Sequence, residues 1–510
     1  MTVEATALLL HPRKPAHALE RLQPDRSFRY RLAGGVDVIR HDGGGVLFSP
    51  RPMTAIRLNV LGAELVSAVS GSEARDLAEI TARVPALSPP VAARFLNDLA
   101  RRRLVVREPG VPVVWPSVSV IVAAYCRPAA TRACVQSLLV LDYPREQLEI
   151  LVVDDASDPP LADALAGLPV RYVRLDHNVG QSAARNLAAA DAEGTLLAFT
   201  DNDCVAAPGW LRDLVPWFGD PDIAVVGGRV IAPSVKGRVA AFEAMRSPLD
   251  MGSTTGAVGP GEAVAYLPTC NLIVGRDAFL AVGGFSADMR VGEDVDFVWR
   301  LAEQGHRGHY ASVAGIIHEH RTRPGDLLRR RVDYGASEAD LQQRHPENGR
   351  VMHVPRVALV GLAALAALPV AWPAAAGLLL LAAALVSAEA AMKWRRVQRL
   401  RLPVPRARLA RSIAREHGAS LYHFGHDVTR YYGVPLVGLA MLWPPLLTVS
   451  AVLMLLPPLC DHRRQQPALS LPVFIGLYWL EMTAYQIGVW RGCLARRCYR
   501  PLLPRIRWRN

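Results

Sequence analysis

The feature that most constrains the fold of this 510-residue chain is a set of short, uninterrupted apolar runs in its middle part. The runs are Val118–Ala124, Leu148–Val153 and Thr195–Phe199. Apolar runs of this length, without polar alternation, are typical of strands that are buried on both faces of a parallel sheet. We therefore expect an α/β domain in this part of the chain.

Acidic side chains directly follow the second and third runs. Asp154 and Asp155 end the second, and Asp201 and Asp203 follow the third. Carboxylates at the carboxyl ends of such strands project into the crevice where open α/β sheets bind ligands. A pair of them carries enough charge to hold a hard divalent cation, which in turn can hold a diphosphate. A D-x-D sequence is also common in solvated loops, so its spacing alone does not distinguish a metal site from such a loop.

Two further segments place polar side chains at loop–helix junctions. Asn178–Ala190 is a glycine turn that leads into a helical pattern carrying Arg185. Gly283–Leu301 contains Glu293 and Asp294 just before an apolar helical pattern. Junctions of this kind are where α/β proteins place their chemistry.

In this order the motifs resemble glycosyltransferase family 2, whose members are inverting enzymes of the GT-A (Rossmann-like) fold that use nucleotide-sugar donors. The resemblance covers about Val118–His320 and includes A-Y, V-V-D-D-x-S, N-x-G-x-x-x-A-R-N, D-x-D, G-G-F and G-E-D-x-D. It implies a UDP-sugar donor with the uracil N–H bonded to Asp155. The residues that it places at the nucleotide sugar are Ala123, Tyr125, Asp155, Arg185 and Asp201.

The same resemblance implies the catalytic and metal-binding roles. Asp203 would ligate Mn²⁺ or Mg²⁺, a Lewis acid for the departing diphosphate. Asp294 would be the general base that takes the proton of the acceptor hydroxyl, although spacing alone does not separate it from Glu293. His318 lies at the offset where some relatives place a histidine ligand, and His320 is its possible substitute. A pair of surface histidines that ends a strand explains the same pattern equally well.

Leu327–Leu341 has the pattern of an amphipathic helix with a run of arginines. Arg330 and Arg331 are candidates for contacts with diphosphate or acceptor, because a guanidinium group suits phosphate oxygens. A basic helix that lies on anionic lipid is the alternative. The Q-x-x-R-W motif of processive polysaccharide synthases is absent, since Gln342–Pro346 is Q-Q-R-H-P. Long-chain synthesis coupled to secretion is therefore not expected.

Residues 1–108 are expected to form a winged-helix-like domain, joined by a linker at 109–117 to the transferase domain at 118–350. After a small β-meander, Thr54–Gly71 is the first of three helical patterns, and Ser72 is the expected cap of the second. The unit resembles the PqqD-like domains that capture leader peptides by strand addition. A packing role is the alternative, and Arg101–Arg103 alone are too few basic residues to predict binding to nucleic acid.

Residues 351–510 contain three apolar blocks near 357–391, 434–460 and 471–490, each long enough to cross about 30 Å of hydrocarbon. Ten lysines and arginines lie within 393–430, and seven arginines lie within 491–510. The positive-inside rule puts these segments and the catalytic domain on the cytoplasmic face. We expect a multi-pass protein of the cell membrane with four crossings, the first block forming a hairpin.

The cysteine content supports this location, whereas the arginine content says little about function. The net charge of +12 comes almost wholly from arginine. The seven cysteines form no C-x-x-C pair, which is typical of reduced thiols in a cytosol-facing protein. Thr2–Arg31 has no apolar core of the kind that a secretory signal requires.

The whole arrangement resembles the mycofactocin-system glycosyltransferases. That resemblance implies transfer of glucose, as β-1,4-linked units, to a peptide-derived redox cofactor. The expected partners are therefore a UDP-sugar donor, this cofactor and membrane lipid, with no nucleic acid. A lipid or cell-wall polysaccharide acceptor is the alternative.

Overall fold

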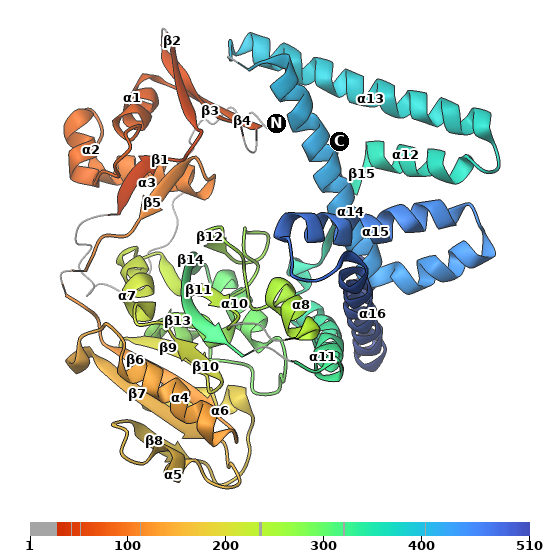
Figure 1. Ribbon diagram of the computed structural model, residues 1–510. Helices are drawn as coiled ribbons and strands as arrows, with labels where there is room; N and C mark the ends of the chain where they lie inside the picture. Colours follow the sequence, from red (N-terminus) through yellow and green to blue (C-terminus); the bar gives the residue numbers. More distant parts are fainter. Residues whose placement is uncertain are drawn as a thin grey trace.

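The computed structural model describes residues 28–41, 43–50, 53–112, 114–233, 237–319, 322–402 and 404–509. Figure 1 shows three parts, which are an N-terminal domain, an α/β domain around a central sheet, and a group of C-terminal helices.

The central sheet contains the three expected parallel strands as direct neighbours. Its strand order is β10-β14-β11-β13-β9-β6-β7-β8, with β12 paired to β14. Strands β9, β6, β7 and β8 are parallel, whereas β13 is antiparallel to both β9 and β11. The strands are β6 Val118–Ala124, β7 Leu148–Asp154, β8 Arg171–Arg174, β9 Leu196–Asp201, β10 Cys204–Ala206, β11 Ile223–Ile231, β12 Gly256–Val258, β13 Leu272–Gly275 and β14 Arg307–His318.

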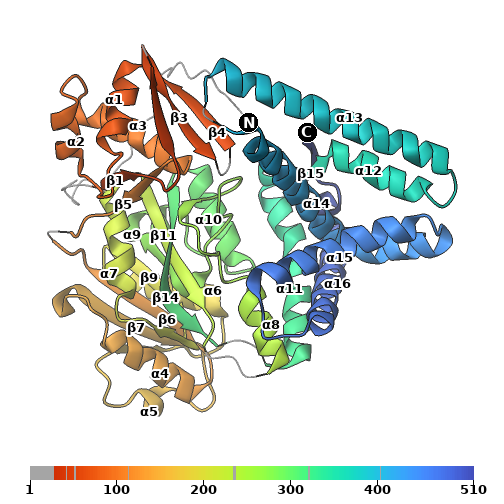
Figure 2. The ribbon, with the colours of Figure 1, turned by 45° about the horizontal axis from the view of Figure 1, so that its top comes forward.

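Helices cover both faces of this sheet (Figure 2). Successive residues of a strand face opposite ways, so Val120 packs into the core on one face and Ile121 into the core on the other. The first face is covered by α4 Pro128–Leu139, α5 Ala162–Leu165 and α7 Trp210–Leu214. The second is covered by α6 Gln181–Asp191, α9 Arg276–Ala281 and α10 Glu293–Glu303. The expected α/β class is confirmed.

The N-terminal domain combines a three-stranded sheet, a two-stranded sheet and three helices. Its elements are β1 Arg29–Leu32, β2 Asp37–His41, β3 Gly44–Pro50, β4 Met53–Leu58, α1 Val60–Ala68, α2 Leu77–Arg83, α3 Pro89–Arg101 and β5 Val105–Glu108. Two local predictions were wrong. Thr54–Leu58 belongs to β4 and not to a helix, and α2 is capped by Asp76 instead of Ser72. Asp76 and Glu79 form a reciprocal capping box, which Ser72 lacks the spacing to make.

The three-stranded sheet of this domain packs against the C-terminal helices. Val46 and Phe48 of β3 share a core with Leu409 and Ile413, which lie near the start of α14. The segment Leu409–His417 has the sequence pattern of an interfacial amphipathic helix, but its apolar side chains Leu409 and Ile413 are buried against the N-terminal domain instead. The sheet offered a large apolar face that the sequence pattern of the helix could not reveal.

The C-terminal region forms two helical hairpins and a long helix that packs on the α/β domain. Helix α11 Pro324–Arg344 ends that domain, and the elements after it are β15 Val351–Pro355, α12 Arg356–Ala367, α13 Trp372–Arg399, α14 Arg406–Leu442, α15 Leu446–Gln465, α16 Leu471–Arg496 and β16 Arg505–Arg509. Helices α12 and α13 form one hairpin and α14 and α15 the other (Figure 1). Another helix, α8 Arg238–Arg246, packs beside α11 and α16.

The expected crossings are only partly matched. The block at 357–391 forms the α12–α13 hairpin, but 434–460 is not one helix, because α14 ends at Leu442 and α15 begins at Leu446. Pro444 and Pro445 explain the break, since proline disfavours a helical residue before it and cannot donate a helical hydrogen bond. By length and composition, Trp372–Arg399 alone among the described helices could cross a membrane. Four crossings are not supported.

Helix α16 is fixed to the α/β domain by an unusually close approach to α11. A Cβ at Gly488 of α16 would lie 2.1 Å from the carbonyl oxygen of Val332, and one at Gly335 of α11 would lie 2.2 Å from that of Tyr485. Only glycine permits backbones to come this close. The block at 471–490 therefore lies along the α/β domain.

Candidate active site

The carboxyl ends of β6, β7 and β9 meet at one edge of the sheet. Ala123 is on β6, and Tyr125 follows that strand with 55% of its surface exposed. Asp155 follows β7 and is buried; it accepts hydrogen bonds from Val179 N–H at 2.7 Å and Gly180 N–H at 2.9 Å. Because Gly180 has a φ of 87°, this turn favours glycine. Asp155 thus holds the turn before α6 at the edge where Ala123 and Tyr125 lie.

Asp154 has a different environment from its neighbour. It is fully buried and accepts hydrogen bonds from Ser157 N–H, Leu161 N–H and the Tyr172 hydroxyl group. Burial alone would raise the pKa of Asp154, but these hydrogen bonds lower it below its usual value. Asp154 therefore shapes the loop after β7, and only Asp155 of the pair faces the sheet edge.

Arg185 on α6 joins the acidic ends of two other elements. Its guanidinium group donates to Asp201 Oδ1 at the end of β9, at 2.5 Å, and to Glu293 Oε1 at the start of α10, at 3.3 Å. Gln181 Nε2 also donates to Glu293 Oε1, at 2.7 Å. The side chain of Arg185 is only 2% exposed, so this link is shielded from solvent. It holds β9 and α10 in fixed positions relative to each other.

Asp294 differs from Glu293 in having few partners. Its hydrogen bond within the described residues comes from the adjacent Val295 N–H. Burial, and then the neighbouring Glu293 carboxylate, raise the pKa of Asp294 to about 7. Burial also raises the pKa of Glu293, against the opposing effect of Arg185. A carboxyl group that titrates near neutrality, with a free oxygen, is suited to exchange a proton.

A cavity of about 510 Å³ opens beside these carboxylates. Of the expected site residues, it is lined by Arg185, Asp201, Glu293, Asp294, Arg330 and Arg331. The C-terminal helices contribute further lining residues, which include Arg430, Tyr431, Glu481 and Tyr485. The described lining does not include the other five expected residues, which lie along the strand ends: Ala123, Tyr125, Asp155, Asp203 and His318. Within the D-N-D segment, Asp201 is therefore the residue that reaches the cavity.

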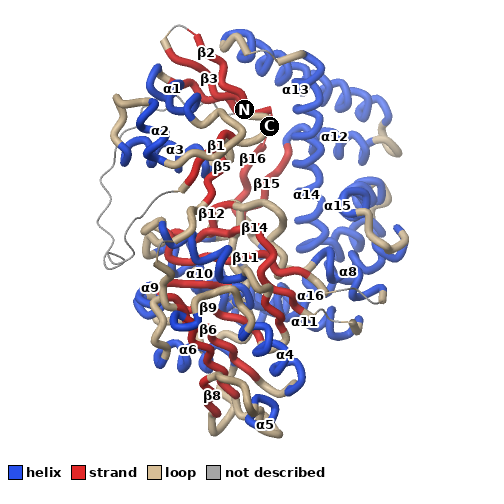
Figure 3. The backbone as a smooth tube through the Cα atoms, turned by 60° about the vertical axis from the view of Figure 1, so that its left-hand side comes forward, coloured by secondary structure: helices blue, strands red, loops and turns tan. Residues whose placement is uncertain are grey.

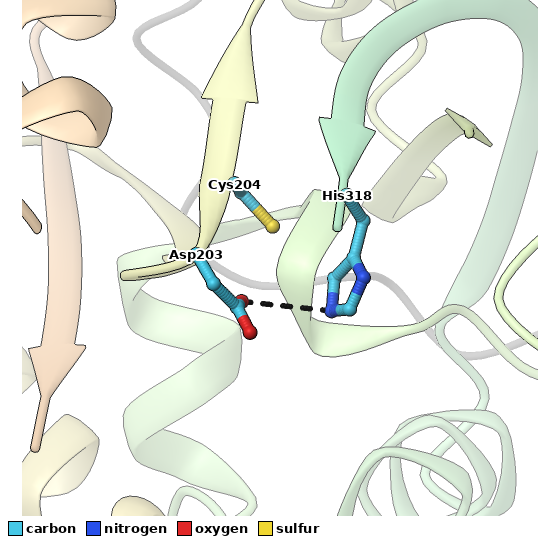
Figure 4. A group of neighbouring side chains, drawn as sticks. All are labelled: Asp203, Cys204 and His318. Atoms are coloured by element: carbon cyan, nitrogen blue, oxygen red, sulfur yellow. Dashed lines mark ion pairs between the residues drawn. The ribbon is translucent and has the colours of Figure 1, made fainter. Parts of the chain in front are cut away.

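Asp203 and His318 lie on neighbouring strand ends, as Figure 4 shows. Asp203 Oδ1 is 3.6 Å from His318 Nε2, and the Cys204 thiol lies within the same 4.8 Å group. Two ligand atoms at this separation can occupy adjacent positions on an ion with bonds of about 2.1 Å. Oxygen and imidazole donors suit Mn²⁺ or Mg²⁺ better than a thiol does. The residues present therefore fit such an ion, and His320 lies outside the described residues.

Arg127 also binds Asp203 and was missed from the sequence. Its guanidinium group lies 2.7 Å from Asp203 Oδ2, and its side chain is 60% exposed. Both Cys126 and Arg127 have positive φ values, of 56° and 57°, which non-glycine residues seldom adopt. This turn directs Arg127 back toward the D-N-D segment. The Y-C-R-P sequence after the first strand is the signal that could have indicated this residue.

The two candidate arginines of α11 have different surroundings. Arg331 is 3% exposed and donates to Glu481 of α16 at 2.8 Å and to Glu243 of α8 at 3.2 Å. Arg330 lies 4.7 Å from the centre of the Tyr334 ring. Arg331 therefore links three helices, while Arg330 lines the cavity without an ion pair among the described residues.

Comparison with known proteins finds glycosyltransferases among the relatives of this chain. Residues 119–279 match the family model Glycosyl transferase family 2. The pre-mycofactocin glycosyltransferase of Mycobacterium tuberculosis (strain ATCC 25618 / H37Rv) is 38% identical over 205 residues, which are 39% of this chain and 43% of that relative. The beta-monoglucosyldiacylglycerol synthase of Synechocystis sp. (strain ATCC 27184 / PCC 6803 / Kazusa) is 26% identical over 250 residues, 48% of this chain and 49% of that relative. The chain thus spans less than half the length of these relatives.

Among solved structures, the mannosyltransferase PcManGT from Pyrobaculum calidifontis, in complex with GDP-Man and Mn²⁺, is 22% identical. It covers 61% of this chain and 88% of its own, with a TM-score of 0.36. Residues 119–279 are similar to family 2 glycosyltransferases, and they contain the strands from β6, apart from its first residue, to β13 of the mixed central sheet. The resemblance to the mycofactocin-system glycosyltransferases is confirmed over the 205 matched residues.

Proposed function

We propose that the chain is an inverting glycosyltransferase that moves a hexose, glucose in our assignment, from a UDP-sugar to an acceptor hydroxyl group. The observation that carries the proposal is the link from Arg185 to Asp201 and Glu293. The link joins the end of β9 to the start of α10, the helix that carries Asp294. All of these side chains line the cavity. Donor and acceptor would meet at this junction.

We assign the general base to Asp294. Support comes from its partners, because Glu293 is already bonded to Gln181 and Arg185 while Asp294 keeps a free oxygen. Its raised pKa lets it accept the proton of the acceptor hydroxyl group near neutral pH. The hydroxyl oxygen would then attack the anomeric carbon on the face opposite the diphosphate, which gives inversion.

Asp203 and His318 are proposed to hold Mn²⁺ or Mg²⁺. When bound, the ion supplies Lewis-acid stabilisation of the charge that develops on the diphosphate. Arg127 neutralises Asp203 in the structure and is exposed enough to turn toward an anionic leaving group. Ala123, Tyr125 and Asp155 are proposed to receive the uridine at the strand edge.

The cavity is the proposed acceptor site. Its far wall comes from the C-terminal helices, where Arg430 lies 3.6 Å from the centre of the Tyr485 ring and Arg350 lies 3.6 Å from that of Tyr431. The hydroxyl groups of both tyrosines donate to Glu338. Stacked and bonded in this way, the tyrosines form firm aromatic walls against which a ring can pack.

The acceptor that we propose is the peptide-derived redox cofactor mycofactocin, extended by β-1,4-linked glucose units. Support comes from the 38% identity to pre-mycofactocin glycosyltransferase, over 205 residues. A lipid acceptor is the second candidate, because 26% identity links the chain to beta-monoglucosyldiacylglycerol synthase and its C-terminal hairpins expose apolar side chains.

We further propose three units with boundaries at 1–108, 118–350 and 351–510, on the cytoplasmic face of the cell membrane. The first unit would bind a peptide as a PqqD-like domain does, by strand addition. Because one face of its three-stranded sheet packs on α14, the strand edges are the surface left for a peptide.

The test is a transfer assay with the purified chain, UDP-glucose and each class of acceptor. Hexose addition to the mycofactocin precursor, seen as increments in its mass, supports the assignment, whereas transfer to diacylglycerol or polyprenyl lipid alone would establish the second candidate. Chelation should abolish turnover, and added Mn²⁺ should restore it. In cells that lack the gene, the cofactor pool should lose its hexose increments.

A further inference from the structure

The two C-terminal hairpins have turns that are unsuited to water. The α12–α13 turn is L-P-V-A, and the α14–α15 turn is W-P-P. Val370 is 67% exposed at the first turn, and Leu442 is 84% exposed at the second. Surface turns normally carry polar residues and glycine, so two exposed apolar turns indicate an apolar surrounding.

The segments around both turns lack charge. Residues 357–388 and 433–460 contain no Asp, Glu, Lys, Arg or His. Figures 1 and 2 both show the two tips projecting from the same side of the molecule. The hairpins can therefore enter one apolar medium together.

Three of the four apolar limbs are too short to cross a bilayer, for which about 20 residues are needed, and the longer α13 is paired with the short α12. At 1.5 Å per residue, α12 is about 18 Å long, and the apolar part of α15, Leu446–Cys460, is about 22 Å long. In the same way, Val434–Leu442 of α14 gives about 14 Å and Trp372–Ala388 of α13 about 25 Å. A hairpin can enter only as deeply as its shorter limb allows, so both reach about the depth of one leaflet with its headgroups.

Polar contacts mark where the first hairpin leaves the apolar medium. Glu389, the first ionisable residue of α13, binds Lys393 and accepts a hydrogen bond from His417 at 2.9 Å. Past this point, Val397 packs against the N-terminal domain. The long helix α13 therefore has an apolar half in the hairpin and a polar half outside it.

The last strand lies at the base of the first hairpin and has two different faces. In β16, Ile506 and Trp508 alternate with arginines, and both are more than half exposed, at 54% and 55%. Pairing with β15 places this strand beside the start of α12 (Figure 3), and Arg356 lies 5.9 Å from the Trp508 ring. Tryptophan next to arginine is typical of the membrane–water interface, where the arginines also attract anionic lipids.

We infer that the α12–α13 and α14–α15 hairpins enter one leaflet of an anionic bilayer side by side and turn back without crossing it, with β16 at the interface. The inference rests on the membrane location proposed above, and not on the sugar or the acceptor. Both ends of the described C-terminal region then lie on the catalytic side. The wall that α14 and α16 give to the cavity would stand close to the lipid surface.

Labelling of the hairpin turns tests this arrangement. The full chain is prepared with Val370→Cys or with Leu442→Cys, in intact cells and in inverted membrane vesicles. Both preparations are treated with a membrane-impermeant maleimide. The parent chain is the control for labelling of the native cysteines. Both cysteines should resist labelling from either side and react once detergent is added. Labelling in intact cells would show that the hairpins cross, and labelling in inverted vesicles would show that the turns lie outside lipid; either result overturns the inference.

A charge at the turn gives a second measurement. Val370→Arg should weaken binding to vesicles of phosphatidylglycerol and phosphatidylcholine at least about tenfold, because an arginine must enter hydrocarbon. Val140→Arg is the matched control, since Val140 is 66% exposed but lies at the end of α4 in the transferase domain. Equal binding by the two variants would contradict insertion. Vesicle binding is measured without sugar, so its outcome does not depend on whether transfer occurs as proposed.

Discussion

The two sides of the candidate site are built in different ways. At the sheet edge, Asp155 and Asp203 follow buried strands closely, and both bond to residues of the same domain. Around the cavity, Glu338 and Tyr485 bond to each other although they are 147 residues apart. The sheet edge is therefore a property of the transferase domain, whereas the cavity needs the C-terminal helices to be docked on it.

The largest expected effect on sugar transfer comes from Asp294, which lies where the sheet edge meets the cavity. Asp294→Asn should lower kcat about a thousandfold, because a positioned general base contributes on this order. Binding of UDP should remain, since the residues at the sheet edge are unchanged. Stopped assays with UDP-glucose, combined with calorimetry of UDP, measure both quantities. If Asp294→Asn transfers sugar at the parent rate, Asp294 is not the base.

Substitution of Arg331 should weaken the docking of α16 and not the chemistry of sugar transfer. Arg331→Leu removes one buried cation from both Glu243 and Glu481, although Glu481 keeps Arg246, and should lower the free energy of unfolding by about 3 kcal/mol. Thermal unfolding in detergent measures the change, and Arg329→Leu, at an exposed position of the same helix, is the matched control. Loss of sugar transfer in the Arg331 variant, with UDP still bound, would confirm that the cavity depends on the docked helix and that the sheet edge does not.

The difference in construction also explains which features the sequence could predict. Strands β6, β7 and β9 and the carboxylates after them follow from local patterns, because burial on both faces leaves an unbroken apolar run. The pairing of Arg331 with Glu481 could not be predicted, since the two residues are 150 positions apart and α16 contains an apolar block that was expected to lie in the membrane. Pro444 and Pro445 mark the break after Leu442 within the block 434–460, but hydropathy alone does not reveal it.

The pH dependence should report Asp294 directly. Burial and the Glu293 charge raise its pKa to about 7, so the carboxyl group keeps its proton, and cannot act as a base, below that pH. The value of kcat/KM should therefore fall about tenfold per pH unit below about 7 and level off above it. Glu293→Gln removes the neighbouring negative charge and should move this limb to lower pH. A parent profile that stays flat down to pH 5 would contradict the assignment.

The smallest effect should come from the far wall of the cavity. Tyr485→Phe keeps the ring that packs on Arg430 but removes the hydroxyl group that donates to Glu338. One such hydrogen bond contributes about 1 kcal/mol, so KM for the acceptor should rise about fivefold while KM for UDP-glucose stays unchanged. Tyr172→Phe is the counterpart beside the sheet edge, because its hydroxyl group bonds to Asp154; it should leave KM for the acceptor unchanged. A rise in KM for the donor, and not the acceptor, in the Tyr485 variant would place the sugar donor in the cavity and remove the distinction between the two sides.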